Sequence, residues 1–275
     1  MATLNDFLSA KPFVSQVGLS WGVPEITLSN NVADSANFID FTAGSAVVSN
    51  GTDRITVTGA ARTKSLNAFA TANNGGSLDT GTKTNSTWYH AYLIYNSTTK
   101  EVAHLFSLSA TAPTMPSGFT YKRRIGAIQT QSNGVIRPFL HHASRQLFEW
   151  ITVVYDMVDV DIAVTDTLYT FTVPTGVPVR MLGRNHPGTP TSNGGELFIM
   201  MRTPGTVLNT DSLSSYAYLV IPPTAEFRVM ASIQVPWITN NAAQLMMRRL
   251  GSYGGSAKTH HITHGWEDIS ILLGA

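Results

Sequence analysis

The stretch Trp88–Phe139 constrains the fold more than any other part of the chain. It holds four strand-like runs separated by turn residues: Trp88–Tyr95, Glu101–Ser109, Tyr121–Thr130 and Val135–Leu140. The polar turn Asn96–Lys100 is typical of a hairpin, and the prolines after the second run exclude a central strand there. The sequence therefore predicts four antiparallel strands in this stretch.

Both faces of the first run are apolar. Successive side chains of a strand alternate between its faces. One face would carry Trp88, His90, Tyr92 and Ile94, and the other Tyr89, Ala91, Leu93 and Tyr95. A solvated antiparallel strand shows one polar face, so we expect cover on both sides, from a second sheet and from another subunit or domain.

The third run contains two adjacent arginines, Arg123 and Arg124, which alternation places on opposite faces. At least one of them should then lie against a covered surface, where it needs a carboxylate or carbonyl partner. Asp79 is one candidate partner, although a solvated loop aspartate is the simpler interpretation. We predict structural or interface roles for five residues: Trp88, Tyr89, Tyr92, Arg123 and Arg124.

Several short motifs in the first half of the chain form a recognisable set. They are Trp88-Tyr89-His90, Ser107–Pro116, Tyr121–Ile128 with its Arg-Arg-Ile-Gly core, Ser29-Asn30-Asn31, Ile39-Asp40, Ala43-Gly44 and Gly76–Gly81. This set resembles a module of tail-fibre and other virion structural proteins of tailed bacteriophages. The resemblance implies a β-rich virion component without catalytic activity, assembled in the bacterial cytoplasm as a homo-oligomer such as a trimer. Other virion structural proteins would be its further partners.

The composition is poor in charge. Charged residues make up 13% of the chain, against roughly a quarter in an average soluble protein. Such a composition is typical of turn-rich β proteins whose surface is partly covered by neighbouring subunits. The net charge of +1 and the lack of a sustained basic stretch argue against nucleic-acid binding. Cysteine is absent, which excludes disulfides, and no run approaches the ~18 apolar residues of a membrane span.

We predict an all-β fold of two antiparallel β-sandwich or jelly-roll-like domains with a short N-terminal arm. Residues 1–25 would form the attachment arm, with one or two helical turns or a disordered start at Met1–Phe13. Residues 26–145 would form the first sandwich, and residues 146–275 the second. The predicted strands of the second are Leu168–Val173, Val179–Gly183, Leu197–Arg202, Tyr216–Ile221, Phe227–Val235, Gln244–Leu250 and His260–Leu273, after an apolar run at Leu147–Asp161.

Three histidines near the C-terminus are the main candidates for metal ligands: His260, His261 and His264. An extended chain places His260 and His264 on one face and His261 on the other, so one subunit cannot gather all three. In a trimer, one histidine from each subunit could converge on the axis and bind a transition metal. Ordinary surface histidines are the alternative that we favour, so we predict no metal and no cofactor.

The acidic residues Asp156, Asp159 and Asp161 could bind calcium, but they lack the glycine and terminal glutamate of an EF-hand loop. A solvated strand edge is the preferred interpretation. The chain has no Gly-x-Ser-x-Gly elbow, no His-Glu-x-x-His motif and no cysteine nucleophile. We therefore predict that it is not an enzyme.

Aromatic residues could also serve a binding function. Trp88 and Trp150 lie within strand patterns and should be core. Tyr253 and Trp266 lie among glycines and are the candidate surface residues for binding glycan. Two hypotheses follow: a structural virion component acting through assembly, or a receptor-binding protein that recognises host surface glycan through its C-terminal domain.

Overall fold

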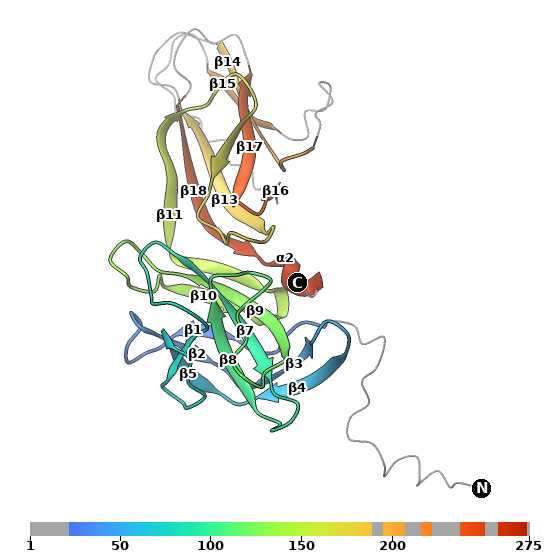
Figure 1. The fold of residues 1–275 in the computed structure, drawn as a ribbon. Coiled ribbons are helices and arrows are strands. Elements are labelled where there is room, and N and C mark those ends of the chain that lie inside the picture. Colours follow the sequence, from blue (N-terminus) through green and yellow to red (C-terminus); the bar gives the residue numbers. More distant parts are fainter. Residues whose placement is uncertain (1–21, 189–194, 207–215, 222–236, 251–257, 274–275) are drawn as a thin grey trace, which may run out of the picture. The chain divides into compact units, whose positions relative to one another are not determined.

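The computed structural model describes residues 22–188, 195–206, 216–221, 237–250 and 258–273. The fold is all-β, as predicted, with one 3-10 turn, η1 (Ala143–Arg145), and one short helix, α2 (Ile269–Leu273), among these residues. The chain divides into two compact units, which we call unit 1 and unit 2 (Figure 1). Unit 1 contains the described residues up to Ile136 and from Ile271 onward, and unit 2 runs from Arg137 to Ser270. Most of the predicted arm, residues 1–21, lies outside the described residues.

Unit 1 is built on one curled sheet of nine strands (Figure 1). In chain order these are β1 (Leu28–Asn30), β2 (Phe38–Phe41), β3 (Gly44–Ser49), β4 (Arg54–Gly59), β5 (Arg62–Ala68), β6 (Gly76–Leu78), β7 (Trp88–Tyr95), β8 (Val102–Ser107) and β9 (Tyr121–Gln129). Their order across the sheet is β1-β2-β5-β6-β8-β7-β9-β3-β4. The β5–β6 and β6–β8 pairs are parallel, which no sequence pattern had indicated.

Three of the four strands predicted in Trp88–Phe139 are confirmed. β7 and β8 form an antiparallel hairpin, and β9 pairs with the other side of β7. The fourth predicted strand is wrong, because its first residues make only an isolated bridge, between Ile136 and Thr130. Pro138 has no N–H to continue a ladder, and the chain leaves this sheet to form β10 (Phe139–His142) in unit 2.

The predicted cover on both faces of β7 is present, and unit 1 supplies it. On one face, β2 packs over β8, with the Phe41 ring stacked on His104 at 4.3 Å between centroids. On the other face, Tyr92 and Leu105 pack into a cluster with Phe119 from the following loop. The curled sheet and its loops thus bury all six central residues of β7, so this strand needs no second subunit to cover it.

Unit 2 is a two-layer β-sandwich. Its strands are β10 (Phe139–His142), β11 (Leu147–Asp161), β12 (Thr167–Thr170), β13 (Arg180–Gly188), β14 (Gly195–Arg202), β15 (Tyr216–Ile221), β16 (Trp237–Ile238), β17 (Gln244–Leu250) and β18 (Lys258–Glu267). One sheet has the order β10-β11-β18-β13-β16 and the other β12-β17-β14-β15. The inner faces meet where Phe171 packs edge-on against His261 at 4.6 Å and where Asn185 Nδ2 lies 3.5 Å from Met201 Sδ.

The strand pattern of unit 2 was largely predictable. β11, β15 and β17 have the predicted bounds, whereas the predicted strand Phe227–Val235 lies outside the described residues. The prediction of one strand from His260 to Leu273 is wrong at its end, because β18 stops at Glu267 and α2 follows. At this junction the Asp268 carboxylate accepts a hydrogen bond from the Ser270 hydroxyl at 2.7 Å, which favours a turn over further extension.

Candidate functional site

The aromatic residues predicted at an interface are structural residues inside unit 1. Tyr89 is fully buried, and its hydroxyl accepts a hydrogen bond from the Thr84 amide at 2.7 Å. Tyr92 is also buried, and its hydroxyl donates to the Ser109 carbonyl at 2.8 Å. Trp88, at the start of β7, is half-buried. These hydroxyl contacts tie β7 to the flanking loops, so Tyr89 and Tyr92 have no exposed surface to offer a partner.

Arg123 and Arg124 are both buried, with 2% and 1% of their surface exposed. Arg123 Nη2 donates to the carbonyl of Gly22 at 3.2 Å and to the carbonyl of Ile271. The prediction of a covered arginine with a carbonyl partner is therefore confirmed. Asp79 has a different role, because its carboxylate accepts hydrogen bonds from the backbone amides of Thr80 and Thr114.

A third buried cation, Lys64 on β5, was not anticipated. Its Nζ donates to the carbonyls of Ala70 and Ala72 at 2.7 Å each and to that of Thr71 at 3.3 Å. Burial lowers the pKa of Lys64 to about 8. Desolvation, with the nearby Lys64 charge, lowers the pKa of the buried His104 to about 3. A lysine in the polar run Arg62–Lys64 gives no sequence signal of burial.

The three C-terminal histidines lie as the alternation predicted, on β18. His261 is fully buried on the inner face, and neither ring nitrogen has a hydrogen-bond partner among the described residues. His260 and His264 point to the opposite, outer face, where His260 Nε2 lies 2.9 Å from Asp159 Oδ1. Desolvation lowers the pKa of His261 to about 3. Within the described residues, no group of three or more His, Cys, Asp and Glu could hold a metal ion.

Charged and histidine side chains gather on the side of the β10-β11-β18-β13-β16 sheet that faces away from the other sheet of unit 2. We call this side the outer face. Cross-strand pairing aligns Tyr155, Ile262 and Arg184 in one row. The next row contains His260 opposite His186. Desolvation, and then the Arg184 charge, lower the pKa of both His186 and His264. The outer face therefore brings an exposed tyrosine, an arginine and several histidines together.

The three aspartates of β11 do not form a common site. Asp156 accepts hydrogen bonds from the Thr172 amide, the Thr172 hydroxyl and the Thr263 hydroxyl. Asp159 contacts His260, and Asp161 lies exposed opposite Lys258. The solvated-edge interpretation is confirmed for Asp161 but is wrong for Asp156, which joins β11 to β18 and to the chain after β12.

Trp266 is a core residue, so the expectation of an exposed ring there is wrong. Its side chain is fully buried and lies parallel to the Phe148 ring at 4.9 Å. Phe148 in turn stacks on His141 at 4.0 Å, which makes a row of rings across β10, β11 and β18. His141 is thus part of this core, and desolvation lowers its pKa to about 4. Tyr253 lies outside the described residues.

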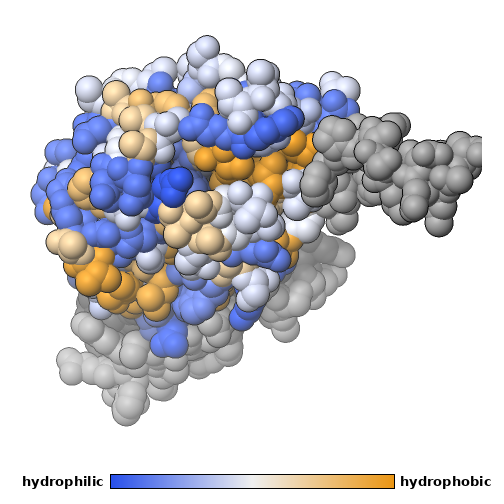
Figure 2. Space-filling model, turned by 90° about the horizontal axis from the view of Figure 1, so that it is seen from below, coloured by the Kyte–Doolittle hydropathy of each residue, from blue (hydrophilic) through white to orange (hydrophobic). Residues whose placement is uncertain are grey.

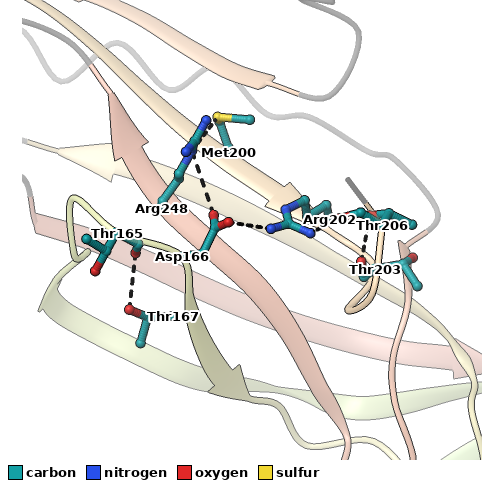
Figure 3. A network of polar contacts seen from close by, with 8 residues as sticks. All are labelled: Thr165, Asp166, Thr167, Met200, Arg202, Thr203, Thr206 and Arg248. Atoms are coloured by element: carbon teal, nitrogen blue, oxygen red, sulfur yellow. Dashed lines mark hydrogen bonds and ion pairs between the residues drawn. The ribbon is translucent and has the colours of Figure 1, made fainter. Parts of the chain in front are cut away.

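A polar network joins the two middle strands of the β12-β17-β14-β15 sheet (Figure 3). Asp166, in the loop before β12, pairs with Arg202 Nη2 at 2.5 Å and lies 3.7 Å from Arg248 Nε. Arg202 also donates to the Thr206 carbonyl, and Arg248 Nε lies 3.3 Å from Met200 Sδ. The Asp166 carboxylate thus connects β14 and β17 to the β11–β12 loop, so its role is structural. Neither Asp166 nor Arg202 was singled out from the sequence.

Exposed apolar side chains concentrate on one part of unit 2; we call this group the apolar strip. It comprises Leu140, Ile151, Val158, Val164 and Leu168, each between 43% and 64% exposed, whereas Tyr155 belongs to the outer face. These residues lie on β10, β11, β12 and the loop before β12. On the face of the molecule in Figure 2, by contrast, hydrophobic residues form separate groups among hydrophilic ones. The apolar strip was not predicted, because the run from Leu147 to Asp161 gives no sign of which residues are exposed.

The class of protein that these observations define is a two-unit all-β protein. Comparison of the chain with protein-family models, with curated proteins and with solved structures finds no match. No helix in the described ranges is long and apolar enough to cross a membrane.

Proposed function

We propose that the protein is a non-enzymatic structural component of a tailed-bacteriophage virion, such as a tail fibre, spike or decoration protein. It acts through homo-oligomeric assembly, with a trimer as the expected state, and through attachment to other virion proteins. The resemblance of the first half of the chain to virion modules supports this proposal. The all-β fold and the charge-poor composition are compatible with it.

The observation that carries the assembly function is the apolar strip. Five large aliphatic side chains, all at least 43% exposed, lie within the segment 140–168. Burial of apolar area contributes roughly 25 cal/mol per Å², so such side chains favour association with a partner surface. Surface apolar residues scattered singly would carry no such argument, but three of these five, Leu140, Ile151 and Val158, lie on β10 and β11, which pair in one sheet.

The edge of β11 indicates how the contact is made. β10 covers only Leu147–Trp150, so the remainder of β11 has no strand on that side within the described residues. This part of β11 contains register shifts, and Asp159 has a positive φ of 52°. Such bulges interrupt a regular backbone edge and disfavour pairing with a strand from another chain. We therefore assign the subunit contact to side chains of the strip.

The test is the solution mass of the full-length protein by light scattering, for the natural chain and for the double variant Ile151→Lys, Val158→Lys. A stable oligomer that the double variant converts to monomer, with unchanged circular dichroism, is the expected result. Val32→Lys is the matched control, because Val32 is 100% exposed on unit 1 and lies outside the strip. A natural chain that stays monomeric at high concentration, or an oligomer indifferent to both lysines, would contradict the assignment. A chelator should leave the mass unchanged.

A second candidate function is receptor recognition, in which unit 2 binds glycan on the host surface. The observation that favours it is the outer face, where the Tyr155 ring is 61% exposed beside charged side chains. Trp266 cannot serve this function, because it is buried. Host-cell adsorption of particles that carry Tyr155→Ala tests the idea. Loss of adsorption with intact assembly would support it, and full adsorption would argue for a purely structural role.

A further inference from the structure

The charges on the outer face do not balance locally. Three of its acidic groups have a cationic or histidine partner: Glu267 pairs with Arg180 at 2.5 Å, Asp159 with His260 at 2.9 Å and Glu149 with His142 at 2.8 Å. Asp161 lies opposite Lys258 in the cross-strand register. Arg184 is exposed and has no carboxylate within ion-pair distance among the described residues.

Two histidines, His186 and His264, lie near Arg184. Each ring accepts a hydrogen bond when it is neutral and carries a positive charge when it is protonated. His186 follows Arg184 on the same face of β13, and its half-buried ring has an Nδ1 atom that is shielded from solvent and has no hydrogen-bond partner within the described residues. The same holds for Nε2 of His264 on β18. Same-face neighbours along a strand lie about 7 Å apart, and cross-strand neighbours about 5 Å apart. The two rings therefore lie close enough to Arg184 for their charge, when they are protonated, to act on a small ligand that Arg184 binds.

An apolar and aromatic surface continues from this group. In the row across three strands, Ile262 lies between Arg184 and Tyr155. The Tyr155 ring is 61% exposed, whereas Ile262 is half-buried. A tyrosine ring offers an apolar face and a polar tip, which suits a ligand that is itself amphipathic. A sugar ring that carries an acidic group has this character, since its C–H face can cover the apolar row while its charge meets Arg184.

We propose that the outer face of unit 2 binds the acidic sugars of an anionic polysaccharide, with Arg184 contacting the carboxylate or phosphate group and Tyr155 the sugar ring. His186 and His264 add positive charge beside this ligand when they are protonated. The inference rests on the second candidate function and names its surface and ligand class. Nucleic acid fits less well, because a duplex needs a longer basic footprint than Arg184 and its neighbours provide.

Binding of an anion to the outer face should depend on pH through His186 and His264. Burial and the Arg184 charge keep the pKa of His186 and His264 below the usual value, so both rings are largely neutral at pH 7. A bound anion favours their protonated forms, and binding should therefore strengthen as the pH falls below about 6.5. The affinity can rise by up to about tenfold per pH unit for each proton taken up. Glu149, which faces His264, and Asp159, which contacts His260, oppose the anion, as do the like charges of Glu267 and Asp161.

The experiment measures binding of the purified full-length protein to polygalacturonate, to a phosphorylated mannan and to neutral dextran between about pH 7.5 and about pH 5.5, which spans the expected window. We expect binding to one or both acidic polymers, tighter at the lower pH, and none to dextran. The two acidic polymers separate a carboxylate ligand from a phosphate ligand. Arg184→Ala should weaken binding about tenfold or more, because a charged hydrogen bond is lost. Arg145→Ala is the matched control, since Arg145 is an exposed arginine of the same unit that lies on η1.

Three results would overturn the inference: no binding to either acidic polymer, an equal loss in Arg145→Ala, or equally tight binding to duplex DNA. Arg184→Ala should keep the natural circular dichroism, because the side chain is exposed. Cell adsorption separates this inference from the receptor function. If Arg184→Ala abolishes polymer binding but leaves adsorption unchanged, the surface is confirmed and the receptor function is refuted.

Discussion

The two units differ in the charged groups that they bury. Unit 1 buries cations on backbone oxygen atoms: Lys64 donates to three carbonyls of the loop after β5, and Arg123 to the carbonyls of Gly22 and Ile271. Both units bury imidazoles beside aromatic rings: His104 stacks on Phe41 in unit 1, and in unit 2 His141 stacks on Phe148 and His261 packs against Phe171. The partly buried carboxylate of unit 2, Asp156, accepts hydrogen bonds from threonine hydroxyls.

The difference follows from how each unit covers its sheets. A single curled sheet with loops on its faces brings irregular backbone inside, and the carbonyls of such loops need donors. A two-layer sandwich covers its inner faces with side chains and leaves the opposite face of each sheet uncovered by the other layer. Unit 2 accordingly carries both candidate surfaces, the apolar strip and the outer face, whereas the strand of unit 1 that was expected to form an interface is enclosed.

The largest expected effect is on the aromatic row of unit 2. Trp266→Ala should destabilise this unit by about 3–5 kcal/mol, because it removes a fully buried indole between Phe148 and Trp150. Denaturant unfolding followed by hydrogen exchange should show earlier opening of β11 and β18, with unit 1 little changed. Tyr155→Ala, an exposed aromatic of the same sheet, should cost under about 0.5 kcal/mol. A comparable loss of stability in both variants would mean that burial of the ring does not determine the free-energy cost of removing it.

Much of the fold could be predicted from the sequence, wherever a strand pattern is strong. Continuous apolar and β-branched residues gave β7 and β11 their bounds, and turn residues delimited β15 and β17. The region 60–87 could not be interpreted in the same way. Its β5 and β6 are stabilised by parallel pairing with each other and with β8, which is distant in sequence, so local pattern carries little of the signal.

The candidate site was harder to predict, and Trp266 shows why. Neighbouring glycines suggested a loop with an exposed ring. In the structure, a Cβ at Gly265 would lie 2.0 Å from the Phe148 carbonyl oxygen, so this glycine permits close approach of β18 to β11. The alternation of His260, His261 and His264 was predictable, because it depends on strand geometry alone. Their partners Asp159 and Arg184 come from other strands, and only the cross-strand register brings them together.

A second prediction compares the two units in acid. The folded pKa values are about 4 for His141 and about 3 for His261 in unit 2, and about 3 for His104 in unit 1, all below the usual 6.5. Between pH 6.5 and these values the unfolded chain binds more protons than the folded chain, so stability present above pH 6.5 is lost as the pH falls. At about pH 5 the loss is about 2 kcal/mol for each histidine. Unit 2, with two such rings, should therefore be the more acid-sensitive unit.

The pH dependence of unit 2 should flatten in His261→Leu, which removes one of its two buried imidazoles. His104→Leu is the matched variant in unit 1, and it should flatten the response of that unit alone. Hydrogen exchange at about pH 7 and pH 5 reports each unit separately. Equal acid sensitivity of the two units in the natural chain would show that other groups, and not these histidines, dominate their response.

The smallest expected effect is on the buried cation of unit 1. Lys64→Met keeps the apolar length of the side chain but leaves the carbonyls of Ala70 and Ala72 without their donor. Because these loop residues are themselves exposed, water can replace part of the loss, and we expect a destabilisation of about 1 kcal/mol. Exchange of the Ser65 and Asn74 amides, which bond across the same loop, should accelerate while unit 2 is unaffected. Lys100→Met, at an exposed lysine of unit 1, is the control. If Lys64→Met stabilised unit 1, the cost of desolvating the ammonium group would exceed the gain from its three carbonyls, and the cation would not be what holds this loop in place.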